Sequence, residues 1–281
     1  MKIFKTIFQV ALLLAILTIL MGADSCHPPK QVGTAQELEK AFIEGYEYGY
    51  VITQNIPPVN KKLVVKNGIT VELQCAKNYG AHKITLSDRI DVDEGGVLNL
   101  GSGSGTYELT IINKSTDLIT NFGTVSVSDG VILSSSNYAI WNGGQLDMNG
   151  GKIHGGGVYN SGDSILNMRG GLINYSSGNG VDNYGEFTMQ NAEICFNNGH
   201  GVYNGRKAKF TMNGVGLIYS NNLSGVYNTG NFIMQNDFNN IRDNLEYGLY
   251  NDYGAYEIFL NHNGIFSNSK CNIWSNGICH Q

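Results

Sequence analysis

Val158-Tyr159-Asn160 is one copy of a three-residue pattern that returns through the second half of this 281-residue chain. The other copies are Ile119-Thr120-Asn121, Ile140-Trp141-Asn142, Val181-Asp182-Asn183, Val202-Tyr203-Asn204, Val226-Tyr227-Asn228 and Leu249-Tyr250-Asn251. Successive asparagines lie between 160 − 142 = 18 and 228 − 204 = 24 residues apart. A repeat of this length is typical of one coil of a solenoid.

Each copy is followed by two apolar residues that are two positions apart, so both point to the same face of a strand. The pairs are Val125/Val127, Leu146/Met148, Leu166/Met168, Phe187/Met189, Phe210/Met212 and Phe232/Met234. A third apolar position follows at Ile132, Ile153, Ile173, Ile194, Ile218 and Ile241. A spacing of two rather than 3.6, with frequent glycine and asparagine, argues against a helical solenoid. No six-residue period indicates a left-handed hexapeptide helix. The pattern predicts an all-β fold, a right-handed parallel β-helix of roughly nine coils.

In a parallel β-helix, equivalent residues of successive coils stack about 4.8 Å apart. We therefore expect the valine or isoleucine of each copy to point inward and the aromatic residue to point outward. The asparagine also points inward, where its amide donates a hydrogen bond to the next asparagine and forms a ladder. Phe187, Phe210 and Phe232 should form one column of the core.

The two ends of the chain differ from the repeats. Lys2 and Lys5 precede a mostly apolar run at 7–20, which predicts a signal peptide over 1–25. Thr34-Ala35-Gln36-Glu37 is a capping box and predicts a short helix over 35–44 that covers the first coil. We divide the rest into an N-terminal segment with that helix at 26–59, the β-helix at 60–265 and a C-terminal cap at 266–281.

The cysteines give two expectations about processing. Cys26 follows small residues at the predicted cleavage site, so it is either the lipid-attachment residue of a lipoprotein or the first residue of a secreted protein. Both alternatives place the protein outside the cytoplasm, at the outer membrane or cell surface or in the medium. Cys271 and Cys279 are spaced for a disulfide in such an oxidising compartment. No Cys or His spacing indicates a metal site, so we expect neither a metal nor a cofactor.

With these repeats laid out, the chain resembles the bacterial right-handed β-helix proteins of the pectate-lyase-like superfamily. The resemblance is carried by Gly201-Val202-Tyr203-Asn204 with Phe210-Thr211-Met212-Asn213-Gly214, and by Gly180-Val181-Asp182-Asn183 with Phe187-Thr188-Met189. It covers about residues 60–265 and implies the fold more than the function. The superfamily contains polysaccharide lyases and hydrolases as well as adhesins and surface proteins without known chemistry.

Gly199-His200-Gly201 resembles a polygalacturonase motif, but that family's Asn-Thr-Asp, Asp-Asp and Arg-Ile-Lys segments are missing here. Glycoside hydrolysis needs two carboxylates at a fixed separation. His200 also stands where the previous copy has Asn179, so we interpret it as a variable coil position. We predict no catalytic residue, and keep a polysaccharide lyase or glycoside hydrolase as the alternative function.

Asp88, Asp91, Asp93 and Glu94 are the densest acidic group and the best candidate for a calcium site. Arg89 shares the strand parity of Asp91 and Asp93 and can pair with them. We therefore favour a solvated strand and turn for this segment.

The outward column of aromatic residues is the candidate binding site. Its members are Trp141, Tyr159, Tyr203, Tyr227 and Tyr250, with Asp182 and Thr120 as interruptions. Aromatics one coil apart form a flat stripe for sugar rings or a partner's side chains, or else only stabilise the sheet. The net charge of −5 and the lack of a basic stripe exclude nucleic acid as a partner. We expect a non-catalytic exported protein that adheres to or binds a glycan or a host or cell-surface protein, with membrane contact through lipid if Cys26 is modified.

Overall fold

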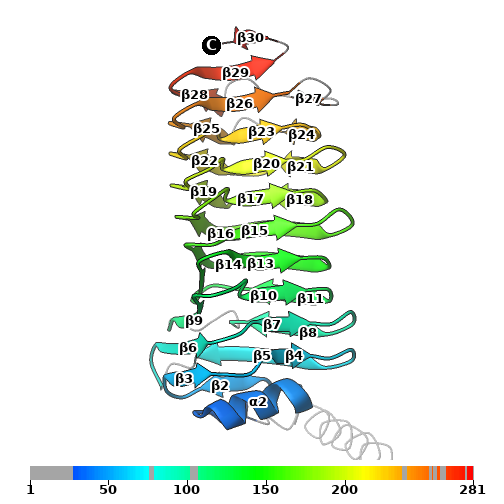
Figure 1. Cartoon of the computed structure of the whole chain (residues 1–281), viewed down its shortest axis with the longest axis vertical. Coiled ribbons are helices and arrows are strands. Elements are labelled where there is room, and N and C mark those ends of the chain that lie inside the picture. Colours follow the sequence, from blue (N-terminus) through cyan, green and yellow to red (C-terminus); the bar gives the residue numbers. More distant parts are fainter. Residues whose placement is uncertain are drawn as a thin grey trace, which may run out of the picture.

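The computed structural model describes residues 28–75, 79–101, 107–235, 239–252, 255, 258–259, 264–275 and 277–280. Within them the chain winds into a parallel β-solenoid of about 10 turns, stacked along one long axis (Figure 1). This confirms the predicted fold class, with one turn more than the nine expected. The described residues contain a single helix, α2 (Ala35–Glu44). The predicted signal peptide and Cys26 lie outside the described residues.

Three strand positions recur in each coil and form three faces along the solenoid. Face 1 consists of β4 (Leu63–Val65), β7 (Ile90–Val92), β10 (Ile119–Asn121), β13 (Tyr138–Asn142), β15 (Gly157–Asn160), β17 (Val181–Asn183), β20 (Val202–Asn204), β23 (Val226–Asn228), β26 (Tyr247–Asn251) and β29 (Cys271–Ser275), followed by the antiparallel β30 (Ile278–His280). Its 11 strands therefore include 11 − 1 = 10 parallel ones.

The other two faces belong to one 19-stranded sheet, because two long strands turn the corner between them. Face 2 consists of β1 (Lys30–Val32), β2 (Tyr50–Ile52), β5 (Thr70–Cys75), β8 (Val97–Leu100), β11 (Thr124–Val127), the first halves of β14 (Gln145–His154) and β16 (Ile165–Asn174), β18 (Glu186–Met189), β21 (Lys209–Met212), β24 (Asn231–Met234) and β27 (Ile258–Phe259). Face 3 consists of β3 (Ile56–Val59), β6 (His82–Leu86), β9 (Leu109–Asn113), β12 (Val131–Ser135), the second halves of β14 and β16, β19 (Glu193–Cys195), β22 (Leu217–Tyr219), β25 (Asn240–Arg242) and β28 (Ile265–Phe266).

The register places equivalent residues of neighbouring coils opposite one another, as the repeat predicted. Phe187, Phe210 and Phe232 are aligned and fully buried, with ring centroids 4.6 Å and 5.1 Å apart. Such stacked pairs add about 0.5–1.5 kcal/mol each beyond the area they bury. At the third apolar position of the repeat the alignment differs from the sequence pattern by one residue: Leu133, not Ile132, aligns with Ile153 and is buried. Side chains alternate along a strand, so Ile132 points outward.

The predicted asparagine ladder is present inside the solenoid. Asn121, Asn142, Asn160, Asn183, Asn204 and Asn228 each donate from Nδ2 to Oδ1 of the next asparagine, at 2.7–2.8 Å, and the ladder ends at Asn251. From Asn121 to Asn204 the second amide hydrogen goes to a backbone carbonyl of the following coil; for Asn204 this is Asn231 O at 2.8 Å. These buried amides are therefore satisfied without water.

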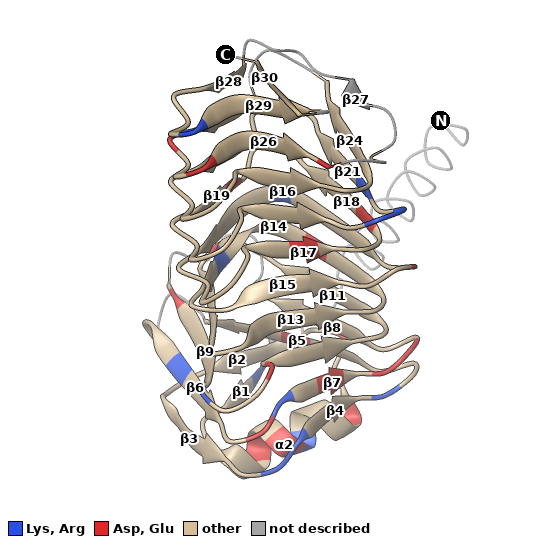
Figure 2. Ribbon diagram, turned by 45° about the horizontal axis from the view of Figure 1, so that its top comes forward, with Lys and Arg blue, Asp and Glu red and all other residues tan. Residues whose placement is uncertain are grey.

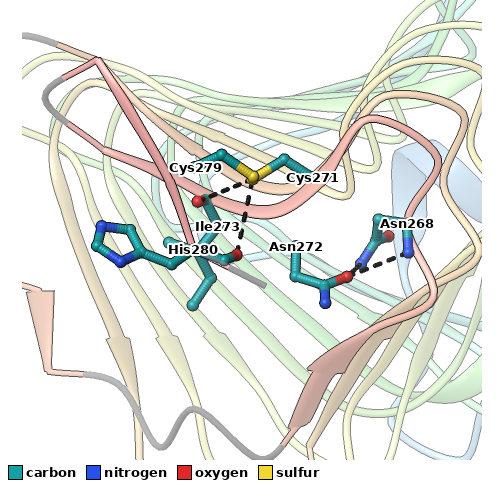
Figure 3. Close-up of a disulfide and its surroundings, with 6 residues drawn as sticks. All are labelled: Asn268, Cys271, Asn272, Ile273, Cys279 and His280. Atoms are coloured by element: carbon teal, nitrogen blue, oxygen red, sulfur yellow. Dashed lines mark hydrogen bonds between the residues drawn. A yellow bond between two sulfur atoms is a disulfide. The ribbon is translucent and has the colours of Figure 1, made fainter.

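A second internal ladder was not predicted. Asn197, Asn221 and Asn244 donate to the next member at 2.9–3.0 Å, and Asn268 then contacts Asn272 (Figure 3). The side chain of Asn197 is fully buried. The residue before each asparagine has a positive φ of 54° to 57°. That left-handed residue turns the chain inward at the corner after face 3.

Close packing between coils explains the glycine of the Gly-Val-Tyr-Asn motif. A Cβ on Gly201 would lie 2.5 Å from Ile218 Cγ2 and 2.6 Å from the carbonyl oxygen of Gly225 in the next coil. Both distances are shorter than van der Waals contact, so the position has no room for a side chain.

Both ends of the solenoid are covered. Helix α2 spans the predicted residues, its capping box joins Thr34 and Glu37, and Leu38, Ala41 and Phe42 are buried against the first coil (Figure 1). Parallel pairing extends on both sides of the predicted 60–265, from β1 to β29.

At the C-terminus, β30 covers the edge of β29 in an antiparallel pair. The disulfide between Cys271 and Cys279, predicted from their spacing, joins these two strands (Figure 3). Cys75 and Cys195 are free and buried.

Candidate binding site on the aromatic face

The short strands of face 1 alternate inward, outward and inward. Val202 and Asn204 are fully buried, while Tyr203 between them is half-exposed. The aligned outward positions, in coil order, are Val64, Asp91, Thr120, Trp141, Tyr159, Asp182, Tyr203, Tyr227, Tyr250 and Trp274. The five predicted binding residues therefore lie in one column. Trp274 extends it by one coil and was missed, because Ser275 replaces the marker asparagine.

The aromatic rings of this column stack on one another. Neighbouring rings from Trp141 to Tyr159, Tyr203 to Tyr227, Tyr227 to Tyr250 and Tyr250 to Trp274 have centroids 4.8–6.4 Å apart and interplanar angles of 6–17°. Nearly parallel rings at such separations are offset-stacked rather than side by side in one plane. The predicted flat stripe is therefore replaced by a stack that presents ring edges and hydroxyl groups outward.

Two tyrosines outside the repeat pattern lie beside the gap at Asp182, and the ring of Tyr184 is tilted against the rings on both sides of the gap. The ring of Tyr184 lies 5.3 Å from Tyr159 and 5.8 Å from Tyr203. Tyr138 packs against Tyr159 and donates its hydroxyl to Asp182 Oδ2 at 2.9 Å. We use the term aromatic ladder for Trp141, Tyr159, Tyr184, Tyr203, Tyr227, Tyr250 and Trp274. Sequence reasoning missed Tyr138 and Tyr184 because each precedes or follows its Val-Tyr-Asn copy rather than occupying the central position.

The outward hydroxyls of the ladder are available for hydrogen bonding. Among the described residues, the hydroxyls of Tyr159, Tyr203, Tyr227 and Tyr250 have no hydrogen-bond partner, and none is buried. A phenolic hydroxyl both donates and accepts. Face 1 thus carries hydroxyl groups one coil apart at Tyr203, Tyr227 and Tyr250, with that of Tyr159 two coils before Tyr203.

At two tyrosines of this face the surroundings favour the protonated hydroxyl. Burial, and then the charge of Asp252, raise the pKa of Tyr227. Burial, followed by the charge of Asp182 and the hydrogen bond to it, raises the pKa of Tyr138 still further. The hydroxyls of Tyr138 and Tyr227 are therefore neutral hydrogen-bonding groups.

His200 lies beside the aromatic ladder, where its ring and its backbone make contacts within the fold. Its ring centroid is 4.9 Å from that of Tyr227, and its Nδ1 accepts the backbone N–H of Ser224 at 3.1 Å. Its own backbone N–H donates to Asn179 Oδ1 at 2.7 Å. Burial lowers the pKa of His200, although the charges of Glu246 and Asp182 oppose this effect. Among the described residues, no carboxylate is hydrogen-bonded to the ring.

Two carboxylates of the acidic segment at 88–94 are paired with basic side chains. Asp91 pairs with Arg89 at 2.6 Å, as strand parity predicted, and with Lys62 at 2.7 Å. Asp93 pairs with Lys66 at 3.2 Å. Within the part of the chain that the structure describes, no three His, Cys, Asp or Glu side chains are grouped so that they could hold a metal ion.

Helix α2 is too short to cross a membrane, and the described segments contain no other helix. Comparison with known proteins found no matching protein family, no matching curated protein and no matching solved structure. The class of the protein is therefore defined by its architecture, a parallel β-solenoid with an aromatic ladder along one face.

Proposed function

We propose that this protein is a non-catalytic polysaccharide-binding protein that acts outside the cytoplasm. The observation that carries the proposal is the row of tyrosine hydroxyls on face 1, free of partners among the described residues and spaced one coil apart. A polysaccharide also presents hydroxyl groups at regular intervals. Laid along the solenoid axis, it meets an equivalent donor and acceptor at successive coils.

The face has further properties that suit such a ligand. The rings are held by their own stack, so little side-chain entropy is lost when a ligand binds. Tyrosine combines apolar ring surface with a polar tip, which matches the mixed surface of a sugar. Each single contact is weak, but several contacts on one chain add up through multivalency.

Adhesion to a host or cell-surface glycan is the biological role that fits this chemistry. We propose that the protein is exported, either anchored through a lipid on Cys26 or secreted, because a basic region, an apolar run and small residues precede that cysteine. The Gly-Val-Tyr-Asn repeats also support a relationship to the pectate-lyase-like superfamily. If the anchor exists, the mature protein partitions into detergent and the Cys26→Ser variant does not. Aqueous partitioning of the unmutated protein would contradict it.

The direct test is a panel of soluble polysaccharides, with binding and chain length both measured after incubation. We expect at least one member to be retained and to keep its length. Shortened chains would instead identify the alternative, a polysaccharide lyase or glycoside hydrolase. Binding of a surface protein but of no polysaccharide would contradict the glycan proposal.

A further inference from the structure

Charge is distributed unevenly along face 1. Asp182 in β17 is the one charged residue in seven consecutive strands of this face, which are β13, β15, β17, β20, β23, β26 and β29. In Figure 2, β17 carries a red segment, whereas the neighbouring strand β15 has none. Asp182 also lies in the middle of the aromatic ladder, between Tyr159 and Tyr203.

The carboxylate of Asp182 is held by neutral groups. Tyr138 donates its hydroxyl at 2.9 Å and Asn179 donates from Nδ2 at 2.7 Å. Among the described residues, no lysine or arginine forms an ion pair with it. Asp91, in the same outward column, is instead paired with Arg89 and Lys62. Asp182 therefore carries the one charge within these seven strands, and no basic side chain among the described residues is paired with it.

We propose that Asp182 makes the aromatic face selective for uncharged polysaccharides over chains that carry carboxylate or sulfate groups. This inference rests on the polysaccharide binding proposed above. A chain that follows the ladder passes over Asp182, since ladder rings lie on both sides of it. An anionic ligand then brings like charges together where aromatic rings exclude water, and the repulsion is stronger there than in bulk solvent.

The contacts of Asp182 favour exclusion of anions over direct capture of a cation. Its side chain is largely buried, with the residue 9% exposed, and both carboxylate oxygens already accept hydrogen bonds. A ligand amine would have to displace Tyr138 or Asn179 to reach it. Electrostatic repulsion requires no such contact, because it acts through space.

The test compares a soluble β-glucan, a xylan and a mannan, each with a carboxylated derivative prepared from the same polymer. Wild-type protein should bind the neutral member of a pair more tightly. Asp182→Asn should strengthen binding of the carboxylated member relative to the neutral member on the order of tenfold. Asp163→Asn is the matched control, since it removes an exposed charge in the turn after β15 and should change neither affinity.

The possible failures are distinct. If no polymer binds, the proposed function itself is wrong and this inference falls with it. If wild-type protein binds both members equally, or Asp182→Asn leaves their ratio unchanged, only the selectivity is wrong.

A salt titration of the wild-type protein provides a second measurement that does not depend on how well the variant folds. The preference for the neutral polymer should narrow at about 1 M NaCl, where the Debye length is about 3 Å. If the ratio of the two affinities does not depend on salt, the preference for the neutral polymer is not electrostatic.

Discussion

At the scale of single residues, asparagine stabilises this protein by satisfying its own hydrogen bonds in the interior. Asn204 accepts from Asn183 at 2.8 Å and donates to Asn228 at 2.7 Å and to the Asn231 carbonyl at 2.8 Å. All these amides point in one direction along the axis, so each hydrogen bond polarises the next. A buried amide without partners would be costly, but the ladder leaves none.

Asn204→Ala should therefore destabilise the protein by about 2 kcal/mol, because it leaves buried groups on both neighbouring coils short of a partner. Asn222→Ala is the control: its side chain makes one exposed hydrogen bond, to Asn198, and its loss should change stability by less than about 0.5 kcal/mol. Urea unfolding midpoints measure both effects. Equal stability of the two variants would contradict a structural role for the ladder.

His200 makes stability depend on pH. It is neutral in the fold, since its Nδ1 accepts the backbone N–H of Ser224, and burial lowers its pKa below the ordinary 6.5. As the pH falls below about 6.5, the unfolded chain binds a proton before the folded one does. The stability is thus complete above about pH 6.5 and is lost as the pH falls through the lowered value.

His200→Asn should make stability depend less on pH, because it removes the imidazole. Asparagine should fit this position, since Asn179 occupies the equivalent position one coil earlier. The measurement is the difference in melting temperature between pH 7 and pH 5. We expect a smaller difference in the variant than in the wild-type protein. The same difference in both would show that His200 does not contribute.

At the scale of elements, the sequence predicts those parts of the fold that recur in register from one coil to the next. Val202, Tyr203 and Asn204 have the predicted orientations because their counterparts stack directly above and below them. The helix at 35–44 was predictable from Thr34 and Glu37, since a capping box is a local signal.

What the sequence did not reveal depends on packing around corners. Asn197 resembles a turn asparagine in composition, and only the left-handed Phe196 before it turns its side chain inward. The tyrosine rings also stack with their edges outward, because a ring is wider than the distance between coils and cannot lie flat beside its neighbour. The order of residues does not show this. Tyr138 and Tyr184 reach the site from positions beside the repeat, so no column predicts them.

The helix that covers the first coil provides a prediction for one element. Thr34→Ala removes the cap and should weaken α2 by about 1 kcal/mol, whereas Thr34→Ser retains the hydroxyl and should match the wild-type protein. Hydrogen exchange of the 35–44 amides should accelerate about fivefold in the alanine variant. Equal exchange in both variants would show that the cap does not hold the helix.

At the scale of the whole molecule, the solenoid places equivalent residues of successive coils in a line along its axis. In three successive coils, Tyr203, Tyr227 and Tyr250 form a stack of rings and a row of hydroxyls with the spacing of the strands. Interior columns give stability, and the outward column of face 1 is the binding surface that we propose. We propose an extended polysaccharide as the ligand, because its hydroxyl groups also repeat along its length.

The central claim is that the hydroxyl row binds a polysaccharide. The most direct test is the dissociation constant of the combined Tyr203→Phe, Tyr227→Phe and Tyr250→Phe variant, with Tyr175→Phe on the corner after face 3 as control. The stacked rings remain in this variant, and the removed hydroxyls have no partners among the described residues, so the fold should persist. We predict that affinity falls on the order of 100-fold while the control is unchanged. A folded triple variant with wild-type affinity would contradict the account.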